Sequence, residues 1–228
     1  MNYIATDRRN VLVMHHDPLL RAGLVAALRQ HQAFDVFVDG DAAASDMDSP
    51  RMHVVIADYG QAMQFVAGAA HGPLAAARVL ILTSNDREAD IRRAVEAGVH
   101  GYLLLGGPLN ELIEGVTMVA RGMRYLAQSV AQRMADSLTR AALTSREVEV
   151  LQLVVAGESN KAIARQLHIE LGTVKSHMTA IMTKLGATSR TQAASIATAR
   201  GLVEEPVLMQ RTPLLPRAHS NSLRPQFA

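Results

Sequence analysis

Short apolar runs alternate with longer amphipathic segments over the first 120 residues of the chain. Runs of four or five apolar residues are typical of strands that are buried on both faces, as in a parallel sheet. The alternation therefore predicts an α/β domain, a five-stranded parallel doubly wound sheet with helices on both faces. The expected strands cover residues 11–14, 34–38, 54–57, 79–82 and 102–105, and the expected helices cover about 18–31, 41–47, 61–70, 87–97 and 109–121.

The pattern changes near residue 140, because only helical spacing continues beyond it. Thr144 and Glu147 have the spacing of a capping box, which begins a helix, and Gly157 is placed to end that helix. A second helix begins at Ser159 or Asn160, and third and fourth helices follow. This half of the chain is therefore predicted to be an all-α, four-helix domain.

The third of these helices, which we expect to begin near Thr173, is polar and cationic on its outer face. A helix of this kind suits the major groove of DNA, where it meets phosphates and base edges. The alternative is the solvated face of an ordinary helical bundle. The spacing of the cap, the glycine turn and the basic helix argues against that alternative. The outer face consists of Lys175, Ser176, Thr179 and Lys184.

The distribution of charge supports the DNA-binding interpretation. The chain contains three lysines, and all three lie between residues 141 and 203. Residues 1–140 carry 13 Arg against 15 Asp and Glu, a net charge of −2, whereas residues 141–203 carry 7 Lys and Arg against 4 Glu, a net charge of +3. A small net charge over the whole chain therefore conceals a basic C-terminal domain, which phosphate binding requires.

Residues 141–203 resemble the LuxR/NarL-type helix-turn-helix domain of bacterial transcription regulators. The resemblance is carried by residues 143–151, 157–164, 173–177 and 184–190. It implies that Lys175, Ser176 and Thr179 face bases or nearby phosphates. It further implies backbone contacts for Asn160, Lys161, Thr173, His177, Lys184 and Arg190, and a dimerisation helix over 189–199 whose small apolar face is Ala193, Ile196 and Ala197.

Residues 9–122 resemble the receiver domain of response regulators. In a parallel doubly wound sheet the functional crevice lies beyond the carboxyl ends of the strands, and Asp58 follows the third expected strand. The resemblance places Asp58 at the phosphoacceptor position. It places Thr83 at the position of the switch hydroxyl and Tyr102 at that of the switch aromatic.

The receiver pocket departs from the family pattern in its charged residues. His15 and His16 replace the acidic pair that holds a divalent cation, and Leu105 replaces the lysine after the fifth strand. Phosphoryl transfer to a carboxylate depends on cations that offset charge on the moving oxygens, and imidazole is a poor ligand for Mg²⁺. We therefore expect Asp58 to be a structural carboxylate that is not phosphorylated.

Three interpretations of the His15, His16 and Asp58 cluster remain open at this stage. The favoured one is a pocket that has lost its chemistry and simply tolerates the histidines. In the second, an imidazolium pairs with Asp58 in place of the missing cation and gives a pH-sensitive conformation. The third is a transition-metal site formed by His15, His16, Asp17 and Asp58, which is disfavoured because adjacent residues of a strand point to opposite faces.

We therefore predict a sequence-specific DNA-binding transcription regulator of the response-regulator type that acts without aspartate phosphorylation. One alternative is a conventional two-component regulator that is phosphorylated on Asp58, and another is a receiver that docks a partner protein. The expected partners are double-stranded DNA and a second copy of the chain, together with a histidine kinase or another regulatory protein in the alternatives.

Several classes of activity are not expected. The chain has no Gly-rich phosphate loop, nucleophile elbow or zinc-protease motif, so neither an enzyme nor a cofactor or metal is predicted. No apolar run approaches the roughly 20 residues that span a bilayer, and a cytoplasmic protein without a signal peptide is expected. The expected organisation is a receiver-like domain at 9–122, a partly helical linker at 123–140, the helix-turn-helix domain at 141–203 and a disordered tail at 204–228.

Overall fold

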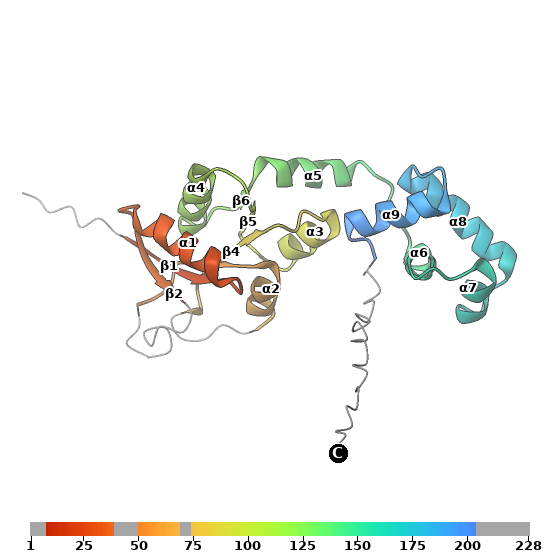
Figure 1. The fold of residues 1–228 in the computed structure, drawn as a ribbon, viewed down its shortest axis with the longest axis horizontal. Coiled ribbons are helices and arrows are strands. Elements are labelled where there is room, and N and C mark those ends of the chain that lie inside the picture. The colour runs from red at the N-terminus through yellow and green to blue at the C-terminus, as the bar shows by residue number, and fades with distance from the viewer. Residues whose placement is uncertain (1–7, 39–49, 69–73, 204–228) are drawn as a thin grey trace, which may run out of the picture.

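A parallel sheet forms the centre of the first half of the chain in the computed structural model, which describes residues 8–38, 50–68 and 74–203 (Figure 1). The five expected strands are confirmed, while the helix expected at 41–47 and the tail lie outside the described residues. The strands are β1 (Arg9–Met14), β2 (Phe34–Val38), β3 (Val54–Ala57), β4 (Arg78–Thr83), β5 (Gly101–Leu104) and a further β6 (Tyr125–Leu126), all parallel, in the spatial order β2-β1-β3-β4-β5-β6.

Four helices pack against the sheet: α1 (Pro18–Arg29), α2 (Tyr59–Ala67), α3 (Glu88–Glu96) and α4 (Leu109–Ala120). Helices α1 and α4 lie on one face and α2 and α3 on the other (Figure 1). Two aspartates that follow strands are the N-caps of helices. Their side chains accept hydrogen bonds from free backbone N–H groups of the first turn. Asp17 caps α1 and Asp58 caps α2.

A sixth strand and the helix after it extend the receiver beyond its expected end. β6 pairs with β5 through Gly101 opposite Tyr125 and Tyr102 opposite Leu126. Val130, in helix α5 (Gln128–Leu138), is fully buried in the same core as the sheet. Residues 125–138, which we expected to form a linker, therefore pack as part of the α/β domain. A two-residue strand is too short to give a periodic signal, which explains why the sequence did not predict it.

The C-terminal half contains four helices: α6 (Ser145–Val155), α7 (Asn160–Gln166), α8 (Leu171–Leu185) and α9 (Arg190–Arg200). They enclose a separate core that includes the fully buried Leu151, Ile163 and Ile181. The capping box of Thr144 and Glu147 is confirmed, and Ser159 rather than Asn160 caps the second helix. The third helix begins at Leu171, two residues earlier than expected.

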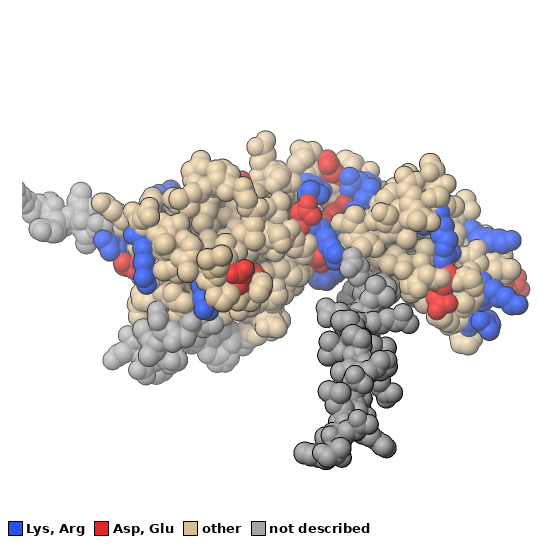
Figure 2. Space-filling model, viewed as in Figure 1, with Lys and Arg blue, Asp and Glu red and all other residues tan. Residues whose placement is uncertain are grey.

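The two domains meet where the end of α9 lies beside α3 (Figure 1). A β-carbon added to Gly201 would lie 3.2 Å from the side chain of Arg87, so the chains approach closely here. Two ion pairs fasten the connection between the domains to the receiver: Arg133 to Asp86 at 2.6 Å and Arg140 to Glu88 at 2.5 Å. Figure 2 shows charged side chains of both signs gathered at this junction.

Candidate DNA interface and receiver pocket

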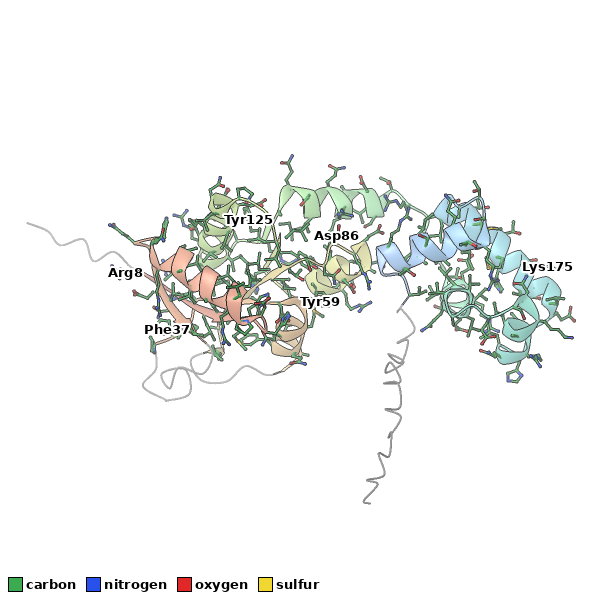
Figure 3. The ribbon with its side chains drawn as sticks, viewed as in Figure 1. Arg8, Phe37, Tyr59, Asp86, Tyr125 and Lys175 are labelled. Carbon is green, nitrogen blue, oxygen red and sulfur yellow. The ribbon has the colours of Figure 1, made fainter. Side chains whose placement is uncertain are left out.

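Helix α8 presents a polar surface to solvent because its apolar side chains point into the domain. Val174 and Ile181 are fully buried, whereas the side of the helix that the sequence assigned to DNA is open. Figure 3 shows Lys175 projecting at the end of the domain that is farthest from the sheet. The exposed residues of this surface are Thr173, Lys175, Ser176 and Thr179, while His177 is half-buried.

Lys184 does not belong to this open surface, contrary to expectation. Its Nζ lies 2.7 Å from Oε2 of Glu147, and the Glu147 side chain is 7% exposed. The same Glu147 oxygen accepts the backbone N–H of Thr144 at 2.7 Å. Burial acts to raise the pKa of Glu147, but the hydrogen bond from Lys184 and those from Thr144 outweigh it and lower the pKa. Lys184 is therefore the counterion of a buried helix cap, and the structure does not leave its ammonium free for phosphate.

Arg190 is also engaged inside the domain. Its Nη1 donates to Oδ1 of Asn160 at 2.9 Å, and its Nη2 donates to the carbonyl of Glu158. These bonds join the beginning of α9 to the beginning of α7. The guanidinium and the Asn160 side chain thus hold two helix starts together. Arg190 and Asn160, which we predicted to contact the DNA backbone, therefore already have partners within the domain. Lys161 remains exposed.

Two exposed cationic or polar side chains near this surface were missed by the sequence analysis. Arg165 lies on α7 and His168 lies just after it. Both line one groove with Lys161 and Glu170. Part of the signal was present in the sequence, because Lys161 and Arg165 are four residues apart and so share a face of α7, whereas His168 follows the end of that helix. That face adds positive charge beside the start of α8.

The predicted dimerisation face is only partly at the surface. Ala193 and Ala197 are fully buried in the core of their own domain, and Ile196 is partly exposed. The small side chains at 193 and 197 therefore allow α9 to pack closely against α6 and α8, which contact it. The structure contradicts a dimer face formed by all three residues.

The receiver pocket brings His16 into contact with Asp58. Strand β1 ends at Met14, so His15 and His16 are free of strand alternation, and their rings stack with centroids 4.8 Å apart. Nδ1 of His16 lies 2.8 Å from Oδ2 of Asp58, and the His16 backbone N–H donates to the same oxygen at 3.2 Å. The other carboxylate oxygen accepts the N–H of Gln61 at 2.9 Å. The histidines are thus not merely tolerated, contrary to the favoured interpretation, because one of them binds the carboxylate.

Of the two buried side chains of this pocket, Asp58 is ionised and His15 is neutral. Burial acts to raise the pKa of Asp58, but hydrogen bonds from the Gln61 backbone and from His16 outweigh it and lower the pKa. Burial lowers the pKa of His15, whose side chain is almost fully enclosed. Asp58 is therefore a stable carboxylate near neutral pH, and His15 is a neutral imidazole.

The ligand atoms of His15, His16 and Asp58 lie within 4.8 Å of one another, as a metal site requires. The objection from strand alternation does not apply, because β1 ends at Met14. The hydrogen bonds of His15 raise a different objection to a metal site. Nδ1 of His15 accepts the N–H of Asp17 at 3.1 Å, and the ring also hydrogen-bonds the Leu82 backbone. Because both sides of the His15 ring are engaged, a metal would have to displace existing hydrogen bonds.

Thr83 is the last residue of β4, Tyr102 is the second residue of β5 and Leu105 directly follows β5. The hydroxyl of Thr83 accepts the N–H of Asn85 at 3.1 Å, and the fully buried Tyr102 donates its hydroxyl to the Asn85 carbonyl at 2.7 Å. Both side chains thus hold the same loop. Leu105 follows β5 and is 37% exposed.

Comparison with known proteins agrees with both halves of the structure. The family described as "Bacterial regulatory proteins, luxR family" matches residues 141–197. "Response regulator RamR" of Streptomyces coelicolor is 31% identical over 84% of this chain and 96% of its own length. "Probable transcriptional regulatory protein NarL" of Mycobacterium tuberculosis is 29% identical over 87% of this chain and 97% of its own. The match to the uncharacterized YvfU of Bacillus subtilis, at 36% identity, spans 62% of that protein.

Solved structures share the fold over 84% of the chain. The RcsB response regulator of Salmonella typhimurium superposes with a TM-score of 0.65 at 20% identity, covering 84% of this chain and all of that one. RcsB in complex with DNA gives a TM-score of 0.61 at 22% identity, again covering 84% of this chain and 98% of that one. Within the described residues, no helix has the length and apolar character needed to cross a membrane.

Replacement of Lys184 tests its assignment as a counterion. We expect Lys184→Ala to lower the free energy of unfolding by about 3 kcal/mol, because it leaves a buried carboxylate without its cation. Lys175→Ala is the control, and its effect should stay within about 0.5 kcal/mol because the side chain is exposed. Urea unfolding followed by circular dichroism measures both. The double variant Lys184→Met with Glu147→Gln, which removes both charges of the pair, should recover most of the lost free energy of unfolding. A Lys184→Ala protein as stable as the wild type would contradict the assignment.

The lowered pKa of His15 predicts how stability depends on pH. The unfolded state takes up a proton below about pH 6.5 while the buried imidazole stays neutral, so stability is full above that pH and falls as the pH decreases. We expect His15→Gln to make the loss between about pH 7 and pH 5 shallower, as measured by urea unfolding at each pH. His100, whose pKa burial also lowers, adds a slope of the same sign that should remain. Equal slopes for His15→Gln and wild type would refute this.

Proposed function

Because the chain belongs to the LuxR/NarL-type response regulators, which are DNA-binding transcription regulators and not enzymes, we propose that it controls transcription without phosphorylation of Asp58. On this proposal the unmodified protein binds its operators with working affinity. The receiver then serves to assemble the protein or to sense a signal other than a phosphodonor.

The observation that carries the proposal is the contact between His16 and Asp58. Both carboxylate oxygens of Asp58 already accept hydrogen bonds, Oδ2 from His16 and Oδ1 from the Gln61 backbone. Nucleophilic attack on phosphorus needs an open carboxylate oxygen and a nearby cation that draws the phosphoryl group to it. Oδ2 is instead in contact with the His16 imidazole at 2.8 Å, and Oδ1 is used to cap α2.

The absence of lysine from residues 1–160 gives independent support. No change of register can bring an ammonium to the pocket from within the receiver. Leu105, at the position where the family has its lysine, lines an apolar pocket between α1 and α4. A phosphoryl group on Asp58 would therefore meet neither a metal held by carboxylates nor a fixed ammonium.

The second candidate is a conventional regulator that is phosphorylated on Asp58 by a histidine kinase. Thr83 and Tyr102 favour it, because both bond the loop after β4 and so retain the parts of a switch. On either candidate the protein acts on double-stranded DNA as a homodimer. The surface of α9 that we propose for dimerisation includes Ile196 and excludes the buried Ala193 and Ala197.

Incubation with a small-molecule phosphodonor and Mg²⁺ separates the two candidates. We expect intact-protein mass spectrometry to show no added phosphoryl group, and DNA affinity to stay unchanged. A response regulator with a complete acidic pair, treated in parallel, is the positive control. An added phosphoryl group that Asp58→Asn abolishes, together with a rise in DNA affinity, would refute phosphorylation-independent control.

Two lysine variants test the proposed DNA interface. We expect Lys175→Ala to weaken binding to the specific site by about 1–3 kcal/mol, because it removes a contact near base edges, while binding to unrelated DNA changes less. Lys161→Ala should weaken binding to all sequences similarly and reduce the salt dependence by about one ion. Titrations at matched salt against a selected site and a scrambled one measure both. Full retention of specific binding by Lys175→Ala would contradict the interface.

A further inference from the structure

Three hydroxyl groups on the exposed side of α8 donate hydrogen bonds back to the helix itself. Oγ of Ser176 lies 3.2 Å from the carbonyl oxygen of Gly172, and Oγ1 of Thr179 lies 3.1 Å from that of Lys175. Oγ1 of Thr183 lies 3.0 Å from the carbonyl oxygen of Thr179. Each bond reaches back four residues, which is the bond that serine and threonine side chains form inside helices.

The direction of these hydrogen bonds is fixed by their partners. A backbone carbonyl oxygen has no proton to give, so the hydroxyl must be the donor, and a hydroxyl has one proton and two lone pairs. The protons of Ser176 and Thr179 are therefore committed to the helix. Both side chains are exposed, so the group that each presents to the outside is an oxygen lone pair.

These two acceptors lie beside a donor on the same surface. Ser176 and Thr179 are three residues apart and are therefore neighbours on the helix, and Lys175 precedes Thr179 by one turn. The ammonium group of Lys175, which projects from the domain in Figure 3, has donors only. The surface thus combines one charged donor with two neutral acceptors.

We propose that Ser176 and Thr179 read the operator as acceptors, from the exocyclic amino groups of adenine or cytosine. These amino groups are the hydrogen-bond donors of the major groove, where guanine N7 and O6 are acceptors that suit a lysine. Each base pair has one amino group in this groove, on its adenine or its cytosine. The two hydroxyls therefore select which strand carries that base.

The acceptor role satisfies more of the hydroxyl than the donor role does. A polar group from which water is excluded costs free energy unless it finds a partner. A hydroxyl that keeps its bond to the helix can also accept from a base, so both its proton and a lone pair have partners. A hydroxyl that turns to donate to a base gives up the bond to the helix and leaves its lone pairs without a donor.

The readout rests on the proposed DNA interface, and single-atom changes in the DNA test it. The full chain first selects a duplex from a random-sequence library. Within the selected half-site, purine in place of adenine, or 2-pyrimidinone in place of cytosine, removes one amino group. A 7-deazapurine, or 2-aminopurine in place of guanine, removes one acceptor. The affinity ratio between altered and natural duplex is compared for wild type and each variant, so that effects on the duplex cancel.

We expect Thr179→Val to bind the selected duplex about threefold to tenfold more weakly than the wild type, because one neutral hydrogen bond is lost. Removal of one particular amino group should weaken wild-type binding by a similar factor and should not weaken Thr179→Val further. Ser176→Ala should be coupled in the same way to another amino group. An unaltered thermal unfolding temperature checks the folding of each variant.

Two further variants are controls. Thr179→Ser keeps the hydroxyl and should retain both the affinity for the amino group and the coupling. Thr183→Val removes a hydroxyl with the same bond to the helix, but one turn further along α8 and outside the proposed interface. It should leave binding to every duplex unchanged.

Two results would overturn this readout. One is coupling of Ser176 or Thr179 to an acceptor, seen as an effect of a 7-deazapurine or of 2-aminopurine that the variant abolishes. The other is the absence of coupling to any amino group while Lys175→Ala still weakens specific binding. If Lys175→Ala leaves specific binding intact, the DNA interface itself is refuted together with the readout, so the two failures are distinguishable.

Discussion

Parallel pairing of β1, β3, β4 and β5 is the constraint on which the receiver pocket depends. In a parallel sheet all strands end at the same edge, so residues separated by more than 40 positions in sequence meet there. The His16 and Asp58 pair exists because β1 and β3 are neighbours in register, with Met14 opposite Ala57. The apolar pocket beside Leu105 is a product of the same edge, since Leu82 and Leu103 lie near the ends of adjacent strands.

The few cations of the C-terminal domain have two different tasks. Lys184 neutralises a buried carboxylate, and Arg190 joins the starts of two helices. Both therefore stabilise the domain from within. Lys161, Lys175 and Arg165 remain exposed and supply the positive surface beside α8. The number of basic side chains in the domain therefore overstates the number available to DNA, because a cation held by a buried acid contributes little to phosphate binding.

The connection between the domains is a structural part of the receiver. β6 adds a strand to the sheet and α5 buries Val130 against it, while Arg133 and Arg140 pair with acids at and just before the start of α3. The loop that holds these acids also carries Asn85, to which Thr83 and Tyr102 bond. Thr83 and Tyr102 are thus connected, through the loop that contains Asn85 and Asp86, to the segment that leads to the DNA-binding domain.

The sequence by itself determined the two domains, five of the six strands of the described sheet, the capping box at Thr144 and the absence of lysine from residues 1–160. Each of these is local, because it depends on periodicity or on the identity of a residue at a short spacing. Only the tertiary structure decided that Lys184 and Arg190 face inward, that Ala193 and Ala197 are core residues and that His16 contacts Asp58. Those outcomes depend on contacts between residues 30 or more positions apart, or on which side of a helix is covered by its neighbours, and a one-dimensional pattern contains neither.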